Sequence, residues 1–133
     1  MPTFYSYLLV GVGSALGGMA RHWTTALVAS RWGAAFPWGT LVVNVAGSLL
    51  IGVLAAALVP DGRWLLPVPA RELLIVGVLG GYTTFSAFSL QTFMLLEQGQ
   101  WLRAGGNVVL SVVLCLAAVT LGYLLASSVL RAG

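Results

Sequence analysis

Residues 80–89, GGYTTFSAFS, place hydroxyl groups and two phenylalanines directly after a pair of glycines. Threonine and serine hydroxyls compete for backbone groups, so Thr83, Thr84 and Ser86 favour a true unwinding of the helix. Unwound backbone exposes carbonyls, and converging carbonyls suit a hard monovalent cation. The segment interrupts a long apolar run, and broken backbone at membrane depth is tolerated only inside protein or beside a wet cavity. The sequence therefore predicts a site here that handles something other than lipid.

Phe85 and Phe88 lie three positions apart and would share one face of a helix that resumes after the break. Phenylalanine is common in membrane cores, so packing against neighbouring helices is one interpretation. The other is chemical, because the edge of a phenyl ring carries partial positive charge and can meet an anion without holding it tightly. Conduction needs sites that attract an ion and also release it. Both interpretations stay open from the sequence.

Two further apolar runs carry small or polar residues at helical spacing, which stacks them on one helix face. They are Thr40, Asn44, Ser48 and Gly52 in one run, and Asn107, Ser111 and Cys115 in the other. Small and hydroxylated residues let membrane helices approach closely, which accounts for Ser48 and Gly52. A carboxamide needs several partners, so Asn44 is either a link between helices or a contact to a ligand.

The composition excludes a soluble domain. Of 133 residues, 59% are hydrophobic and 7% are charged, whereas soluble domains carry about 25% charged residues. A bilayer crossing needs about 20 apolar residues as helix, and four runs reach that length. We expect helices at residues 4–29, 40–59, 73–96 and 104–130. The sequence thus predicts an all-α membrane protein with one four-helix transmembrane domain over residues 1–133 and a third helix broken mid-membrane.

The charged residues lie near the ends of the runs. All six basic residues are arginines, scattered singly, so the basic composition does not indicate a nucleic-acid partner. The acids Asp61, Glu72 and Glu97 lie in or next to connections, away from the depth at which a proton relay would need them. Arg21 lies deepest and either snorkels to the interface or places positive charge at a pore mouth. A lone cysteine, Cys115, excludes an internal disulfide.

The arginines favour neither orientation in the membrane. Four crossings would place Arg63, Arg71 and Arg131 on one side and Arg21, Arg31 and Arg103 on the other. Orientation normally follows an excess of arginine and lysine in short cytoplasmic loops, and three against three is no excess. A chain that inserts both ways can build an antiparallel homodimer, equivalent to an inverted repeat. A break near the midplane would then face its own copy around a central cation.

Two segments resemble the signature segments of the Fluc or CrcB family of small dual-topology fluoride channels. They are PWGTLVVNVAGSLLIG, residues 37–52, and GVLGGYTTFSAFSLQ, residues 77–91. GGMARHW, residues 17–23, is similar to that family's glycine-rich first-helix segment ending in arginine. The likeness covers essentially the whole chain. It implies a multi-pass protein of the bacterial inner membrane, surrounded by lipid, that acts not as an enzyme but as an antiparallel homodimer with two pores passively exporting fluoride.

The resemblance also implies roles for individual residues. The pore phenylalanines match Phe85 and Phe88, the pore asparagine matches Asn44, and the polar track of the fourth helix matches Asn107, Ser111 and Cys115. A central sodium ion would be held by the backbone carbonyls of Gly80 and Thr83, and Arg21 matches an arginine of the vestibule or of the structure. Relatives often have tyrosine at the position of Asn107 and serine at that of Cys115, and a thiol is the weaker donor.

A four-helix multidrug exporter is the main alternative, because it shares the size and the dual topology. Such proton-coupled antiporters need an acid embedded in the membrane, conventionally a glutamate in the first helix, and residues 4–29 contain none. A purely structural membrane subunit would explain the polar stripes but not the hydroxyl-rich break. A cation channel would need a ring of acids. The resemblance to the Fluc or CrcB family therefore leads us to expect a fluoride channel.

Overall fold

The computed structural model describes residues 1–57 and 65–132. In chain order, the helices are α1 (Phe4–Trp32), α2 (Trp38–Ala55), α3 (Val68–Arg71), the π-helix η1 (Glu72–Leu79), α4 (Gly80–Tyr82), α5 (Phe85–Glu97) and α6 (Trp101–Ala132). The described ranges contain no strand, so the all-α prediction is confirmed. Asp61, Arg63 and the predicted helix end at residue 59 lie outside the described residues.

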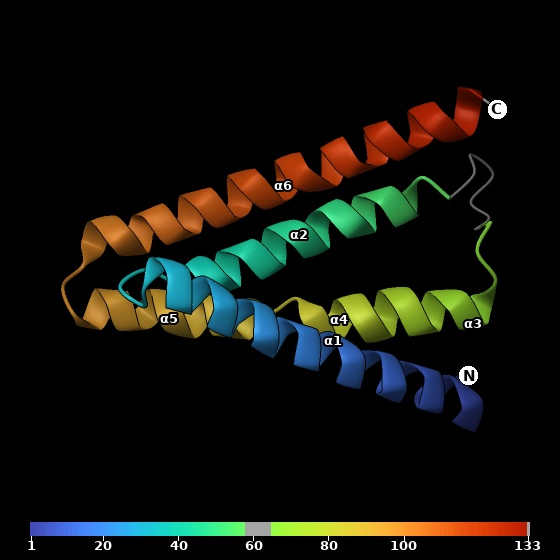
Figure 1. Ribbon diagram of the computed structural model, residues 1–133, viewed down its shortest axis with the longest axis horizontal. Coiled ribbons are helices and arrows are strands. Elements are labelled where there is room, and N and C mark those ends of the chain that lie inside the picture. Colours follow the sequence, from blue (N-terminus) through green and yellow to red (C-terminus); the bar gives the residue numbers. More distant parts are fainter. Residues whose placement is uncertain (58–64, 133) are drawn as a thin grey trace.

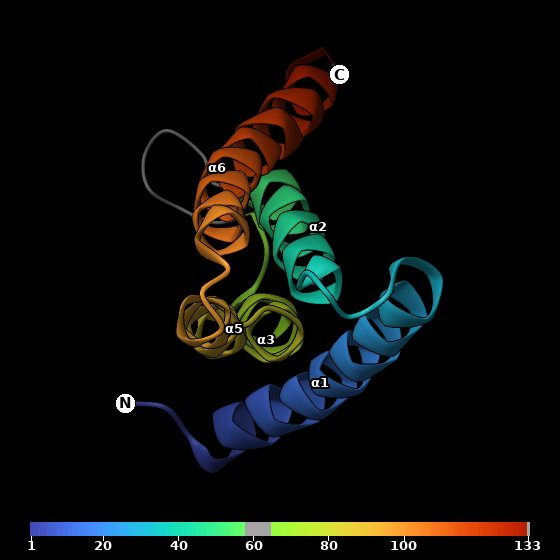
Figure 2. The same cartoon turned by 90° about the vertical axis from the view of Figure 1, so that its left-hand side faces the viewer.

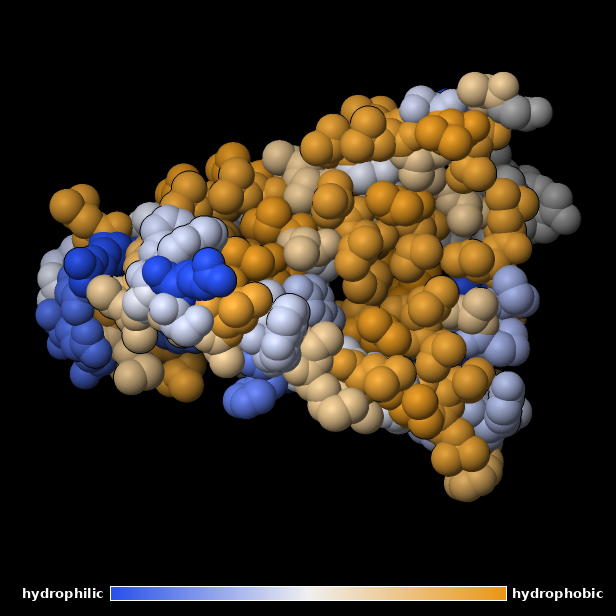
Figure 3. Space-filling model, viewed as in Figure 1, coloured by the Kyte–Doolittle hydropathy of each residue, from blue (hydrophilic) through white to orange (hydrophobic). Residues whose placement is uncertain are grey.

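Three helical stretches are long and apolar enough to cross a membrane: 38–55, 68–97 and 101–132. Apolar side chains cover most of the face in Figure 3, and hydrophilic ones gather at the end where α1 finishes and α6 begins. The chain is a membrane protein. α1 is not among these stretches, because it carries Arg21 and His22 and several hydroxyl-bearing residues among its apolar ones. With 29 residues at about 1.5 Å each, α1 is still long enough to span a bilayer core, and a four-helix domain stays a prediction.

Most helix boundaries differ from the predicted ones by a few residues, and two of the differences have clear local reasons. α1 continues to Trp32 and ends where Gly33 adopts a positive φ of 78°, a conformation that favours glycine. The third helical stretch begins at Val68, because Pro69 falls in the first turn, where a missing N–H costs nothing. The sequence predicts a non-helical connection before residue 73. That prediction is wrong for residues 68–72, which are helical.

The broken third helix lies between α1 and the pair formed by α2 and α6. α2 packs along α6, α1 packs along η1 and α4, and α5 contacts α6 (Figure 1). The end-on view shows α3 and α5 between α1 and α6, while α2 adjoins the later part of α1 directly (Figure 2). Both chain ends lie at the same end of the molecule (Figure 1), which agrees with an even number of crossings.

Glycines make the closest helix crossings. A Cβ added to Gly52 of α2 or to Gly122 of α6 would clash with the backbone of the other helix. Between α1 and η1, a Cβ on Gly77 would lie 2.9 Å from the Cα atom of Gly13. Lipid tails are as apolar as leucine, so membrane helices associate largely by close packing of this kind. The packing role predicted for Gly52 is confirmed, and Gly122 serves the same close approach on α6.

Candidate functional site beside the broken helix

The third helix is unwound at two residues, Thr83 and Thr84. Their φ and ψ angles are −86° and 159° for Thr83, and −154° and 117° for Thr84, so both are extended. The chain is helical again from Phe85, and residues 80–82 remain helical before the break. The unwinding is therefore confirmed, over a shorter stretch than the ten residues that suggest it in the sequence.

Each backbone polar group of these two residues has a partner within the protein. The Thr83 N–H donates to the Leu79 carbonyl at 3.0 Å, and the Thr83 carbonyl accepts from Nη1 of Arg21 at 3.3 Å. The Thr84 N–H donates to Oδ1 of Asn44 at 2.8 Å, and the Thr84 carbonyl accepts from Nδ2 of Asn44 at 2.9 Å. A bilayer core offers no water to unwound backbone. The fold supplies the missing partners from α1 and α2.

The hydroxyl groups of the break serve the adjoining helix ends. Thr84 is the N-cap of α5, and its Oγ1 accepts from the Ala87 N–H at 3.2 Å. This bond satisfies one of the free N–H groups in the first turn. Oγ1 of Thr83 donates back to the Leu79 carbonyl at 2.9 Å. The two threonines therefore close one helix and start the next.

A cavity of about 530 Å³, the break cavity, adjoins the unwound residues. The predicted site residues in its lining are Asn44, Gly80, Thr83, Phe85, Phe88, Ser111 and Cys115. The ring centroids of Phe85 and Phe88 lie 5.2 Å apart, and Phe85 is 78% exposed in the single chain. The fold thus brings to one place the polar and aromatic residues that the sequence distributes over the second, third and fourth predicted helices.

A larger cavity of about 880 Å³, the arginine-lined cavity, includes Arg21, Gln91 and Arg103 in its lining. Oε1 of Gln91 is buried there without a hydrogen-bond partner in the described structure. Among the residues that the structure describes, neither cavity is lined by an aspartate or a glutamate. A cleft lined by positive charge attracts anions. Thr84 is common to the two linings, so the break separates the cavities.

Comparison with known proteins agrees with this arrangement. The family model described as "CrcB-like protein, Camphor Resistance (CrcB)" matches residues 8–123, which include the break and both sets of cavity-lining helices. The chain belongs to this family. The resemblance expected from the sequence is confirmed.

Curated relatives of this CrcB-like protein match it over nearly their whole length. A protein of Opitutus terrae is 55% identical over 120 residues, covering 90% of this chain and 91% of the relative. A protein of Methylocella silvestris is 50% identical over 123 residues, covering 92% and 94%. A protein of Paramagnetospirillum magneticum is 50% identical over 126 residues, covering 95% and 98%. Each of the three is named "Fluoride-specific ion channel FluC".

Two predicted site residues of the CrcB-like chain lie outside the break cavity. Arg21 turns inward to the Thr83 carbonyl and lines the arginine-lined cavity, which does not support snorkelling to the interface. Asn107 is 1% exposed, and its Nδ2 donates to Oγ1 of Thr92 at 2.9 Å. Its Oδ1 faces Oγ of Ser111 at 3.5 Å. Asn107 thus links α6 to α5, one turn away from a residue that lines the break cavity.

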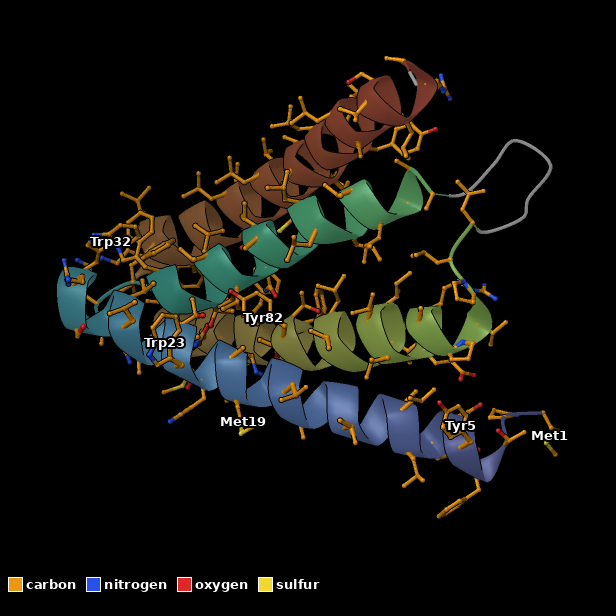
Figure 4. All side chains as sticks on the ribbon, turned by 45° about the vertical axis from the view of Figure 1, so that its right-hand side comes forward. Met1, Tyr5, Met19, Trp23, Trp32 and Tyr82 are labelled. Carbon is orange, nitrogen blue, oxygen red and sulfur yellow. The ribbon has the colours of Figure 1, made fainter. Side chains whose placement is uncertain are left out.

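The sequence identifies both Asn44 and Thr84, but it does not reveal the hydrogen bonds between them, nor Thr92 as the partner of Asn107. A threonine directly before a resuming helix is a typical N-cap, so Thr84 carried a usable signal. Tyr82 precedes the break, and its hydroxyl lies 3.4 Å from Oγ1 of Thr24 on α1. Figure 4 labels Tyr82, with Trp23 on the adjoining part of α1 and Met1 and Tyr5 at the distant chain end.

Proposed function

We propose that this CrcB-like protein is a fluoride-selective channel that exports fluoride passively across a bacterial inner membrane. The observation that carries the proposal is the break cavity, which joins Asn44, Ser111 and the two phenylalanines beside an unwound helix. The names of relatives that are 50–55% identical support fluoride as the ion. The family is one of channels, and the chain is not an enzyme.

Fluoride is small and strongly hydrated, so a pore must replace its water with donors of comparable strength. Ser111 offers a hydroxyl whose bond to Asn107 is long, at 3.5 Å, and therefore weak enough to exchange for an ion. Asn44 keeps one amide N–H beyond the one it gives to Thr84. Phe85 and Phe88 add positively polarised ring edges. A lining without carboxylates, in the described residues, gives no attraction to cations.

We further propose that two copies assemble as an antiparallel homodimer with two pores. The equal distribution of arginines supports insertion in both orientations. Phe85 is 78% exposed beside the polar break, and backbone that is unwound in a bilayer has to be covered by protein or water rather than lipid. A second copy seated over the break cavity would provide that cover, and lipid would surround the remaining apolar faces.

A structural sodium ion at the dimer centre, held by the carbonyls of Gly80 and Thr83, fits the residues present. In an unbroken helix the Gly80 carbonyl would pair with the Thr84 N–H, which donates to Asn44 instead. The Thr83 carbonyl would pair with the Ala87 N–H, which donates to Oγ1 of Thr84. The break therefore releases these two carbonyls from the helix ladder. The Thr83 carbonyl also accepts from Nη1 of Arg21 at 3.3 Å, so a sodium ion would share this oxygen with the guanidinium through its second lone pair. When bound, sodium would neutralise them and join the two subunits.

Flux from liposomes tests the proposal. Protein is reconstituted into vesicles loaded with potassium fluoride, and a potassium ionophore is added so that charge movement does not limit the anion. We expect rapid fluoride efflux at a fluoride electrode and none of comparable rate from vesicles loaded with chloride. Equal efflux rates for fluoride and chloride would contradict the proposed selectivity. Transport of a cationic dye against a proton gradient would instead indicate a multidrug exporter.

A further inference from the structure

The side chain of Asn44 forms hydrogen bonds with both backbone polar groups of Thr84, and we call this pair of bonds the clamp. Its Oδ1 accepts from the Thr84 N–H at 2.8 Å, and its Nδ2 donates to the Thr84 carbonyl at 2.9 Å. We propose that Asn44 is a positioning residue, which acts on the ion path through Thr84 by fixing the start of α5. The inference rests on the proposed fluoride channel and deepens it. An asparagine whose only role is to donate a hydrogen bond to the ion would function without its two bonds to Thr84.

The clamp is connected directly to the aromatic residues of the break cavity. Thr84 caps α5 through the Ala87 N–H, and Phe85 is the next residue along the chain. Two bonds from one planar carboxamide set the orientation of the Thr84 backbone, as a neighbouring strand would. The direction in which α5 leaves the break, and with it the position of Phe85 and Phe88, therefore depends on Asn44.

Two further observations place this clamp at the centre of the site. Thr84 is the residue that both cavity linings share, so its position sets the boundary between them. By taking the Thr84 N–H, Asn44 also leaves the Gly80 carbonyl without its partner in the helix. One side chain thus couples the aromatic part of the path to the Gly80 carbonyl, one of the two proposed sodium ligands.

The variant Asn44→Asp separates a clamp from a donor. A protonated carboxylic acid can accept from the Thr84 N–H with one oxygen and donate its O–H to the Thr84 carbonyl, so it restores both bonds. It then has no hydrogen left for an ion. An ionised carboxylate loses the donor and repels the carbonyl. The charged or titratable groups around the break are Arg21 and His22 on α1, Tyr82 before the break, whose ring packs beside Gly47 of α2, and Cys115 on α6.

We expect fluoride flux through Asn44→Asp to be low near about pH 7.5 and to recover at least about tenfold towards about pH 5.5 as the acid protonates. The unsubstituted protein in the same buffers corrects for Arg21, His22, Tyr82 and Cys115, and protein-free vesicles give the leak of hydrogen fluoride. If flux through Asn44→Asp does not recover at acid pH while the unsubstituted protein conducts, the positioning role of Asn44 is wrong but the proposed function stands. A lack of flux in the unsubstituted protein would overturn the proposed function as well.

A backbone ester at Thr84, introduced as the α-hydroxy acid by nonsense suppression, gives an independent test. It removes the N–H that Asn44 accepts and leaves the carboxamide in place. We expect flux to fall at least about tenfold, since about 1.4 kcal/mol in the working conformation corresponds to that factor. The matched control is the same ester at Thr120, an exposed threonine on α6 outside both cavity linings. Normal flux with the Thr84 ester would overturn the proposal.

A fluorine resonance reports the ring position itself. With 4-fluorophenylalanine at position 85, we expect the ¹⁹F signal to shift in Asn44→Asp at neutral pH and to return towards the original position at acid pH. The control label at position 93, on α5 but outside both cavity linings, should not move. An unmoved signal at position 85 in a variant that has lost flux would show that Asn44 acts without positioning the ring.

Discussion

The guanidinium of Arg21 lies 3.3 Å from the carbonyl oxygen of Thr83 and joins the middle of α1 to the unwound part of the third helix. Together with Asn44, it gives the break its hydrogen-bond partners from two other helices. The break is therefore held within a single chain. A second copy and a cation would add to a geometry that the subunit already contains.

Replacing Arg21 with glutamine should destabilise the protein. The shorter side chain leaves the Thr83 carbonyl without its donor in a low-dielectric setting, which costs about 1–3 kcal/mol. Thermal unfolding in detergent measures the change, with Arg31→Gln as the control, because Arg31 is exposed near the end of the same helix. Equal melting temperatures for the two variants would show that the bond to Thr83 contributes no net stability.

Replacing Phe85 or Phe88 with isoleucine should reduce fluoride flux sharply while the proposed dimer still assembles. Isoleucine fills similar space but has no polarised ring edge, so an effect on flux isolates the electrostatic role of the ring. The control is Phe93→Ile, since Phe93 is exposed on the same helix outside both cavity linings. A flux assay in liposomes checks the loss of conduction, and size-exclusion chromatography checks the assembly. Retained flux would mean that the rings serve only for packing.

The sequence predicted the membrane helices and the broken third helix because both depend on local composition. Continuous apolar runs of about 20 residues indicate membrane-spanning helices, and Thr83 and Thr84 mark the unwound point by their capping chemistry. It did not predict the π-helical turns of η1 before Gly80. It also missed the bonds from Arg21 and Asn44 to the break, because those partners lie 62 and 40 positions away along the chain and meet only through helix packing.

Asn107 provides a test of which polar residues meet the ion. It is buried against Thr92 and is absent from the lining of the break cavity. The variant Asn107→Leu should therefore lower stability by about 1 kcal/mol, as expected for a lost interhelical hydrogen bond, while flux stays close to that of the unsubstituted protein. Ser111→Ala, one turn away and in the lining, should show the opposite pattern. Loss of flux in Asn107→Leu without loss of stability would place Asn107 in the polar track.

Cys115 allows the break cavity to be labelled chemically without first introducing a cysteine by mutation. It is the one cysteine of the chain, is partly buried and lines the cavity with Phe85 and Phe88. A small cationic methanethiosulfonate reagent that forms a mixed disulfide there should block fluoride flux, because the added group occupies space in the path. Reducing agent should restore the flux by releasing the thiol. Cys115→Ser should conduct and resist the reagent, since a hydroxyl lines the same position and does not react. Complete modification, verified by mass spectrometry, with unchanged flux would show that the ion passes elsewhere, and the break cavity would then be a feature of packing rather than the pore.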